Sequence, residues 1–341
     1  MKKYLNLLIA FSILFACNKS EGVRFLHIQE NDCEPLQSAV WQKNDNSRFY
    51  YDLRVTESYY AFLDEKSDTI IRIYKQDAPY SLYNFHIEKE NNILNNKLLF
   101  LKSNTRSKAE ENQLWIVEDK LAIKTINIEN PTQLLSPTHD YPFKGLPLSA
   151  EFNLTKDEIY ASPLNSTYNS PYYLYRPDSG YIRASVYKHA DIIYPATGEA
   201  YVTSLIVSEE NKRIVSAQRF MNDVLFYDLR GEIKTVVSFG EGHIIPETKY
   251  NKVDIENSKK CFIYICGTKE YVYCLYDGTI DYTANSKIVV FNWSGKHIKT
   301  FQADRCLKQI AVDKNNTKII ALAANEQHGR DVVHYQIKIK K

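Results

Sequence analysis

VSEENKRIVSAQRFMNDVLFYDLRG, residues 207–231, is the stretch that decides the predicted fold. Two apolar runs, at 213–217 and 224–228, are each preceded by a turn segment, at 208–211 and 220–223. The second run closes at Leu229-Arg230-Gly231. Short apolar runs bounded by Asn, Asp and Gly are typical of antiparallel strands joined by tight turns. The stretch therefore predicts one unit of a repeated β-structure.

Copies of this unit recur along the chain. Glycines that close a second strand stand at 180, 231 and 295, which are 51 and 64 residues apart. The longer interval holds an additional hairpin, FIYICGTKEYVYCLYDG at 262–278, and a last unit at 310–337 stops before a closing strand. Short strands that repeat about every 45 to 60 residues match the blades of a β-propeller.

The predicted fold is all-β, a six-bladed β-propeller closed by an N-terminal strand. It covers 25–341, because about 320 residues divided by about 50 per blade gives six. We expect a strand at 25–29 to complete the C-terminal blade. In the N-terminal third we predict strands at 48–55, 59–63, 69–74, 81–88, 98–102, 114–118 and 122–128, followed by a polar, proline-bearing link at 130–147. A two-domain β-sandwich is the alternative architecture.

The N-terminus carries an export signal. Lys2 and Lys3 precede an apolar run at 4–16, and Cys17 follows Ala16 directly. A basic segment, about a dozen apolar residues and a small residue are typical of a secretory signal, which is too short to span a bilayer. The cysteine in this place resembles a bacterial lipobox, which implies removal of the signal peptide at 1–16 and attachment of diacylglycerol to Cys17. We expect a lipid-anchored tether at 17–24, and a plain secretory signal is the alternative.

The charge balance bears on the partners. Removal of 1–16 takes two of the 43 basic side chains and leaves 41 basic against 41 acidic ones. Nucleic-acid binding needs a concentrated positive field, so we expect no nucleic-acid partner. The 26 Tyr and 15 Phe favour strands, because aromatic side chains cover a half-buried pleated surface. The expected partners are the membrane, through the N-terminal lipid, and a glycan, peptide or protein ligand.

The repeats and the lipobox together resemble a known family. Two strands end in aromatic-Asp/Asn-x-x-Gly, at 227–231 and 291–295, and Ile310-Ala311-Val312-Asp313 opens the last unit. In these features the chain, over about 145–337, looks like the TolB-like six-bladed propeller lipoproteins of Bacteroidetes. The resemblance implies a lipid-anchored propeller in the envelope of a Gram-negative bacterium, at the outer membrane. It transfers no catalytic residue.

Cysteine spacing and catalytic motifs give no sign of a metal or a reaction. A zinc site needs two close pairs of ligands with a loop between them, and the chain has no such arrangement. It also lacks a Gly-x-Ser-x-Gly elbow, a His-Glu-x-x-His helix, a phosphate-binding Gly loop and an EF-hand spacing. We expect the remaining cysteines to act as small buried apolar side chains: Cys33, Cys261, Cys266, Cys274 and Cys306.

We therefore predict a binding or protein-interaction module without catalytic residues, bound cofactor or metal. Binding surfaces on propellers are made by loops held on a rigid ring. Tyr and Arg side chains anchor interfaces well. The predicted binding residues come from the loop 165–173 and the turn 219–223: Tyr168, Tyr172, Tyr173, Arg219 and Asn222.

The alternative function is a calcium-dependent hydrolase of lactones or esters. Six-bladed propellers can hold Ca²⁺ in the central channel, and calcium favours oxygen ligands. Asn153, Asn222 and Asp254 lie near predicted blade starts or loops and are the candidate ligands.

Overall fold

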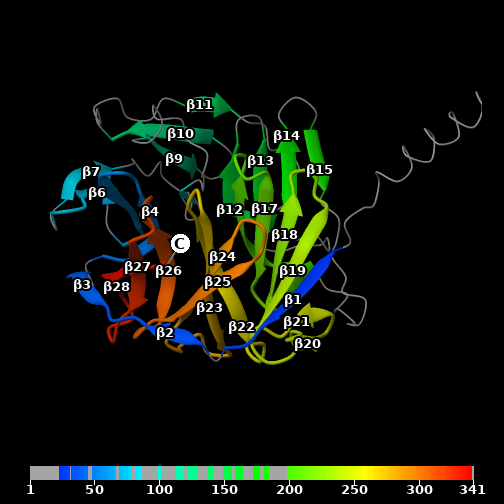
Figure 1. The fold of residues 1–341 in the computed structure, drawn as a ribbon. Helices are drawn as coiled ribbons and strands as arrows, with labels where there is room; N and C mark the ends of the chain where they lie inside the picture. Colours follow the sequence, from blue (N-terminus) through cyan, green and yellow to red (C-terminus); the bar gives the residue numbers. More distant parts are fainter. Residues whose placement is uncertain are drawn as a thin grey trace, which may run out of the picture.

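Nearly all of the structure is β-strand (Figure 1). The computed structural model describes residues 23–30, 32–44, 48–66, 69–78, 81–86, 99–100, 113–118, 122–128, 137–140, 149–155, 158–163, 172–176, 180–183 and 198–339. The only helical element in these ranges is a 3₁₀ turn, η2, at Gly198–Tyr201, so the all-β prediction is confirmed. A helix long and apolar enough to cross a membrane is not found within these ranges. The predicted signal peptide, Cys17 and Tyr168 lie outside them.

Three sheets of four strands come from the N-terminal half of the chain. Sheet I comprises β4 (Tyr50–Val55), β5 (Tyr59–Asp64), β6 (Thr69–Lys75) and β7 (Ser81–His86). Sheet II comprises β8 (Leu99–Phe100), β9 (Gln113–Glu118), β10 (Ala122–Asn127) and β11 (Pro137–Asp140). Sheet III comprises β12 (Ser149–Leu154), β13 (Ile159–Pro163), β14 (Tyr173–Arg176) and β15 (Gly180–Arg183). Strands adjacent in sequence pair antiparallel in each sheet.

Three further sheets come from the C-terminal half. Sheet IV has β16 (Thr203–Ser208), β17 (Arg213–Gln218), β18 (Asp223–Asp228) and β19 (Ile233–Phe239). Sheet V has β22 (Lys260–Gly267), β23 (Tyr271–Thr279), β24 (Lys287–Asn292) and β25 (His297–Gln302). Sheet VI has β26 (Leu307–Val312), β27 (Lys318–Ala324) and β28 (Arg330–Gln336), and a small hairpin of β20 (Thr248–Lys249) and β21 (Lys252–Val253) lies between sheets IV and V in the chain.

The first three strands of the chain each join a C-terminal sheet. Strand β1 (Arg24–Ile28) pairs parallel with β19, and β2 (Cys33–Pro35) pairs parallel with β25. Strand β3 (Ala39–Gln42) pairs antiparallel with β28 and is the fourth strand of sheet VI. The expectation that 25–29 completes the last sheet is therefore wrong, because β3 takes that place.

Side-chain packing explains the place of β3. Trp41 on β3 lies 5.3 Å, centroid to centroid, from both Tyr60 and Tyr74 of sheet I. It also stacks on His334 of β28 at 5.9 Å. Its indole thus fills the space between sheets VI and I, and burial of so large an aromatic side chain is strongly favourable.

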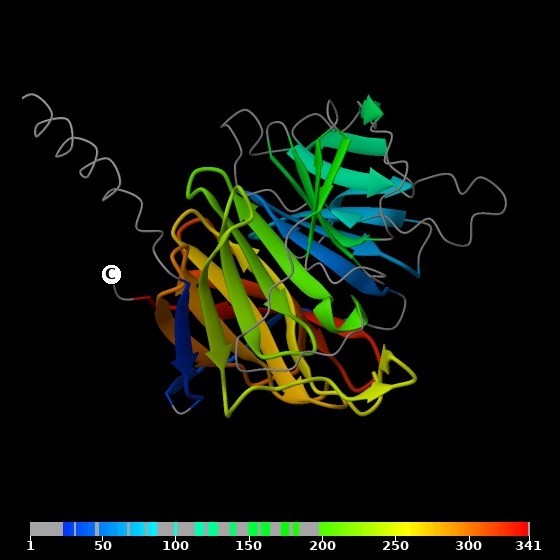
Figure 2. The ribbon, with the colours of Figure 1, turned by 90° about the vertical axis from the view of Figure 1, so that its right-hand side faces the viewer.

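Most neighbouring sheets pack face to face and share apolar cores in the described residues. One core lies between sheets IV and V, and includes Val215, Phe226, Phe262 and Phe291. Others lie between sheets III and IV, between V and VI, and between VI and I. The sheets fan out around a common centre in Figure 1, and the edge-on view of Figure 2 shows their twist. Turns between strands are therefore held on a rigid base.

Candidate functional site

The turn that ends the quoted stretch is built on one carboxylate. Asp228 Oδ1 accepts hydrogen bonds from the backbone N–H groups of Arg230 and Glu232, both at 3.0 Å. Gly231 follows with φ of 87°, in the left-handed region that glycine adopts without a steric cost. Asn292 and Gly295 repeat this turn in sheet V, where Asn292 Oδ1 accepts from Ser294 N and Lys296 N. The repeated Asp/Asn-x-x-Gly pattern is thus a turn motif.

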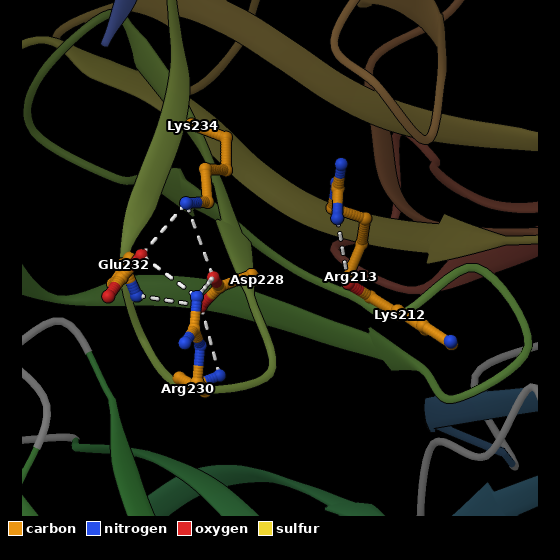
Figure 3. Close-up of polar contacts among 6 residues, drawn as sticks. All are labelled: Lys212, Arg213, Asp228, Arg230, Glu232 and Lys234. Atoms are coloured by element: carbon orange, nitrogen blue, oxygen red, sulfur yellow. Dashed lines mark hydrogen bonds and ion pairs between the residues drawn. The ribbon is translucent and has the colours of Figure 1, made fainter. Parts of the chain in front are cut away.

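Cations surround the Asp228 carboxylate (Figure 3). Oδ2 lies 3.4 Å from both Arg230 Nη2 and Lys234 Nζ, and Lys234 also pairs with Glu232 at 2.8 Å. Partial burial acts to raise the pKa of Asp228, but the hydrogen bonds from Glu232 N–H and Lys234 outweigh it, so the pKa lies below its usual value. The carboxylate is charged and fully engaged at neutral pH.

Arg213 lies next to this turn but takes no part in it. The register of β17 and β18 places Arg213 opposite Asp228. Even so, within the described part of the chain its guanidinium donates only to the backbone oxygen of Lys212, from Nη1 at 3.0 Å, and Figure 3 shows it turned away from Asp228. A guanidinium has five N–H donors in a planar fork, so most of the donors of Arg213 are available to a ligand.

The side chain of Arg213 lines an open groove between sheets IV and V, which we call the IV–V groove. Its volume is about 470 Å³. Its lining combines cationic, anionic, amide, hydroxyl and aromatic side chains: Asn211, Arg213, Lys269, Glu270, Tyr271, Asn292, Trp293 and Ser294. Aromatic and planar polar side chains in one groove are typical of sites that hold a polar, partly apolar ligand.

Contacts between the two sheets fix the shape of the groove. Asn211 Nδ2, on the turn after β16, donates to Lys269 O on the turn after β22, at 3.0 Å. Trp293 is buried, and its Nε1 donates to Thr268 O at 3.1 Å. Lys269 pairs with Glu210 at 2.5 Å. The Asn211 bond and the Lys269 ion pair join the two rims of the groove, and the Trp293 bond holds the rim of sheet V. Among the described residues, the Arg213 guanidinium keeps a single bond, to its own neighbour.

A second, larger hollow of about 530 Å³ lies between sheets V and VI. Its two aspartates and Arg305 are already paired. Asp331 lies 3.0 Å from Arg305 Nη1 and accepts from Asn44 N and Asn325 Nδ2. Asp304 accepts from Gln37, Ser38 and Tyr335. Because its polar groups hold neighbouring segments together, size alone does not make it the better binding site.

A buried polar cluster joins the first strands of sheets I, V and VI, which are β4, β22 and β26. Gln309 on β26 donates to Asp52 Oδ1 on β4, at 2.5 Å, and to Tyr264 Oη on β22, at 2.9 Å. Arg54 Nη1 donates to the same Tyr264 oxygen at 2.8 Å. Hydrogen bonds to a buried charge contribute more than neutral ones. The cluster therefore ties sheets I, V and VI together.

The predicted binding residues lie in different surroundings. Tyr172 and Tyr173 are buried, and Tyr172 packs edge to face on Tyr227 of sheet IV at 5.3 Å. Burial raises the pKa of Tyr172. Arg219 is half-buried, and its backbone N–H donates to Val202 O. Tyr168 lies outside the described residues.

Asn222 serves the loop that follows β19. It is buried, and its Nδ2 donates to Phe239 O at 2.7 Å and Gly242 O at 2.8 Å. Its Oδ1 accepts from Ile244 N at 2.9 Å. All of these contacts are with the chain's own backbone. A role of the five predicted residues in ligand binding stays a prediction.

The three candidate calcium ligands contact different segments. Asn153 donates to Leu205 O, Asn222 holds the loop described above, and Asp254 accepts from Asn257. In the part of the chain that the structure describes, no group of three or more His, Cys, Asp or Glu side chains is placed to hold a metal ion. The calcium-dependent hydrolase stays an untested alternative.

The cysteines of the described residues are free thiols. Cys261 and Cys274 are buried in the core, as expected of small apolar side chains, whereas Cys33, Cys266 and Cys306 are partly exposed. Burial raises the pKa of Cys261 to about 12. A thiol with so high a pKa is inert at neutral pH.

Comparison with known proteins by sequence identifies no relative. No family model matches the chain, and no curated protein matches it. The TolB-like relationship is therefore not shown.

Comparison by structure identifies the fold. A protein from Bacteroides fragilis that is described as exported superimposes with a TM-score of 0.57 at 9% identity, over 94% of this chain and 100% of that one. A member of the DUF4221 family from Bacteroides vulgatus gives 0.54 at 13% identity, over 92% and 100%. The β-propeller domain of Cps50 (Swd1) from Myceliophthora thermophila gives 0.45 at 10% identity, over 89% and 100%, which is too low to carry an argument.

The fold therefore defines an all-β protein built from radiating four-stranded sheets, the arrangement of a β-propeller. The chain shares this fold with two Bacteroides proteins.

Proposed function

We propose that this protein is a lipid-anchored, six-bladed β-propeller of the bacterial cell envelope that acts as a binding module, with its ligand in the IV–V groove. No cofactor or catalytic step enters this proposal. The main support for this proposal is the Arg213 guanidinium in the IV–V groove, whose N–H donors are mostly available to a ligand.

Contacts between the first strands support a closed ring of six blades. Strand β4 contacts β8, β8 contacts β12, and β12 contacts β16. The order continues through β22 and β26, and β26 contacts β4 again. In propellers the first strand of each blade lies innermost and an N-terminal strand often completes the last blade, which is the position of β3 in sheet VI.

The N-terminal sequence supports the envelope location. Lys2 and Lys3, the apolar run at 4–16 and Cys17 have the order of a lipoprotein signal. The structural similarity to a Bacteroides fragilis protein that is described as exported agrees with export of this chain. We place the anchored protein at the outer membrane.

The chemistry of the IV–V groove favours an acidic glycan as the ligand. A guanidinium binds a carboxylate through two parallel hydrogen bonds. Tyr271 offers a half-exposed ring for the apolar face of a sugar, and Asn211 and Ser294 add polar groups at the rim. A peptide cannot add a strand to β19 or β25, because β1 and β2 already pair with these strands.

Titration calorimetry of the full chain with oligogalacturonate, and with maltohexaose as a neutral probe, tests the proposal. We expect binding of the acidic probe, weakened about 10- to 100-fold in Arg213→Ala because a charged hydrogen-bond donor is lost. Lys212→Ala is the matched control, since Lys212 is exposed on the same turn and should leave affinity unchanged.

Three results would overturn the proposal: no binding of the acidic probe, equal affinity of wild type and Arg213→Ala, or cleavage of the probe during the titration. The last result would establish an enzyme.

A further inference from the structure

Strand β1 is an extra strand at the edge of sheet IV. Sheet IV already has four strands, and β1 is a fifth at its outer edge, in the order β1-β19-β18-β17-β16. Figure 1 shows it in blue along the rim of the molecule. Edge strands are normally protected by charged side chains or by cover, because an exposed apolar edge invites association.

The β1 edge carries exposed apolar side chains beside Arg24 and His27. Val23, Phe25 and Leu26 are 39%, 51% and 41% exposed, and they are three of the eight exposed large apolar side chains in the described residues. So close a cluster, within four consecutive positions, marks an interaction surface.

Both ends of β1 are fixed to the rigid fold. The Arg24 guanidinium donates to Thr235 Oγ1 at 2.9 Å and to Ser294 O at 2.8 Å. At the other end, Ile28 packs on the core between sheets IV and V. The exposed apolar side chains are thus presented by a strand that is held in place at two points.

The distance along the chain to Cys17 identifies what this edge faces. Six peptide units separate Cys17 from Val23. A fully extended chain spans at most about 3.6 Å per residue, so Val23 lies within about 22 Å of Cys17. If Cys17 carries acyl chains, as the proposed function holds, the β1 edge is kept beside the bilayer surface.

We infer that the β1 edge, formed by Val23, Phe25 and Leu26, inserts into the interfacial region of the bilayer that holds the Cys17 lipid. The inference rests on the proposed lipid anchor. It orients the protein edge-on, with the rim of sheets IV and V toward the lipid. Aromatic and aliphatic side chains at the headgroup boundary add to the binding by a lipid anchor.

A second copy of the chain is the weaker explanation of this edge. Stable protein interfaces bury at least about 1,000 Å², whereas an aromatic side chain buries about 150–250 Å². Three partly exposed side chains fall well below that area. A tethered segment beside a bilayer needs no such area, because the tether keeps its effective concentration high.

Fluorescence of the full-length lipoprotein in phosphatidylethanolamine and phosphatidylglycerol vesicles tests the inference. In Phe25→Trp we expect the added emission, after subtraction of the wild-type signal, to shift to the blue and to be quenched at least about twofold by brominated lipids. Tyr250→Trp is the matched control. Tyr250 is 88% exposed on the β20–β21 hairpin, drawn in yellow in Figure 2 on the side of the molecule opposite the blue β1.

Mass spectrometry of the Cys17 peptide distinguishes failure of the bilayer-insertion inference from failure of the proposed lipid anchor. An acylated Cys17 with unquenched, water-like emission of Phe25→Trp would overturn the inference and leave the anchor intact. An unmodified Cys17 would overturn the anchor and the inference with it. A blue shift of the Phe25→Trp emission that accompanies dimerisation in detergent, without quenching by brominated lipids, would assign the edge to a second copy.

Discussion

Lowering the pH should weaken the seam between β3 and β28 through His334. The imidazole stacks on Trp41 at 5.9 Å and contacts Tyr60 edge to face at 5.4 Å. Its Nε2 is buried and has no hydrogen-bond partner in the described part of the chain. Burial, with a smaller contribution from Lys318, lowers the pKa of His334 to about 4.

The direction of the effect follows from the two pKa values. In the unfolded chain a histidine has a pKa of about 6.5, so between pH 6.5 and 4 the unfolded state binds the proton more strongly. The contribution of His334 to stability is complete above pH 6.5 and is lost as the pH falls to 4. A shift of about 2.5 units corresponds to at most about 3.4 kcal/mol, and because the ring stays partly exposed we expect about 1–2 kcal/mol.

Urea unfolding followed by tryptophan fluorescence, at several pH values from 7.5 to 4.5, measures this loss. The His334→Phe variant keeps an aromatic ring against Trp41 but cannot be protonated. The carboxylates titrate alike in both proteins, so the difference between the two curves isolates His334. We expect wild type to lose about 1–2 kcal/mol more than the variant, and identical pH dependence of the two proteins would refute the reasoning.

Three further predictions concern stability. Gly295→Ala should lower the free energy of unfolding by about 2–4 kcal/mol, because φ is 83° and an added Cβ would lie 2.9 Å from Thr235 Cγ2. Gly242→Ala, at φ of 62° with open space around it, should lower it by about 1–2 kcal/mol. Equal shifts of the urea midpoint in the two variants would contradict this prediction. Gln309→Leu should lower the free energy of unfolding by about 1–3 kcal/mol, since it removes a donor from the buried Asp52 carboxylate, and an unchanged midpoint would count against that role. Asp228→Asn should be less stable than wild type at pH 7, and the difference should shrink as the pH falls below 3.8 through the lowered pKa of Asp228, because the carboxylate stabilises the fold only while it is charged. A difference that does not change with pH would exclude this cause.

Local turn chemistry made part of the fold predictable. Asp228 with Gly231, and Asn292 with Gly295, are turns whose geometry depends on their own side chains and on a positive φ. The hairpin predicted at 262–278 is present as β22 and β23. In contrast, β11 lies within the predicted link at 130–147, because PTHD has no apolar alternation and forms a strand only by pairing with β10.

The candidate site was less predictable than the fold. Arg213 lies inside the quoted stretch, but a charged residue at the start of an apolar strand gives no sign of where its guanidinium points. Its availability depends on Arg230 and Lys234, which occupy the Asp228 carboxylate that the strand register places opposite it. Trp293 and Tyr271 join it in one groove only because sheet V packs on sheet IV.

The sequence by itself determined the strand-rich class, the repeated units and their turns, because these depend on alternation and on the backbone preferences of neighbouring residues. Only the tertiary structure decided how the N-terminal strands pair. An isolated strand such as AVWQ at 39–42 can pair with any free edge, and β3 lies on β28 because Trp41 packs, partly buried, between sheets VI and I. Likewise β1 lies on β19, where Arg24 reaches acceptors more than 200 residues away. Such long-range choices are made by side-chain burial in the assembled molecule, which no local pattern of the chain encodes.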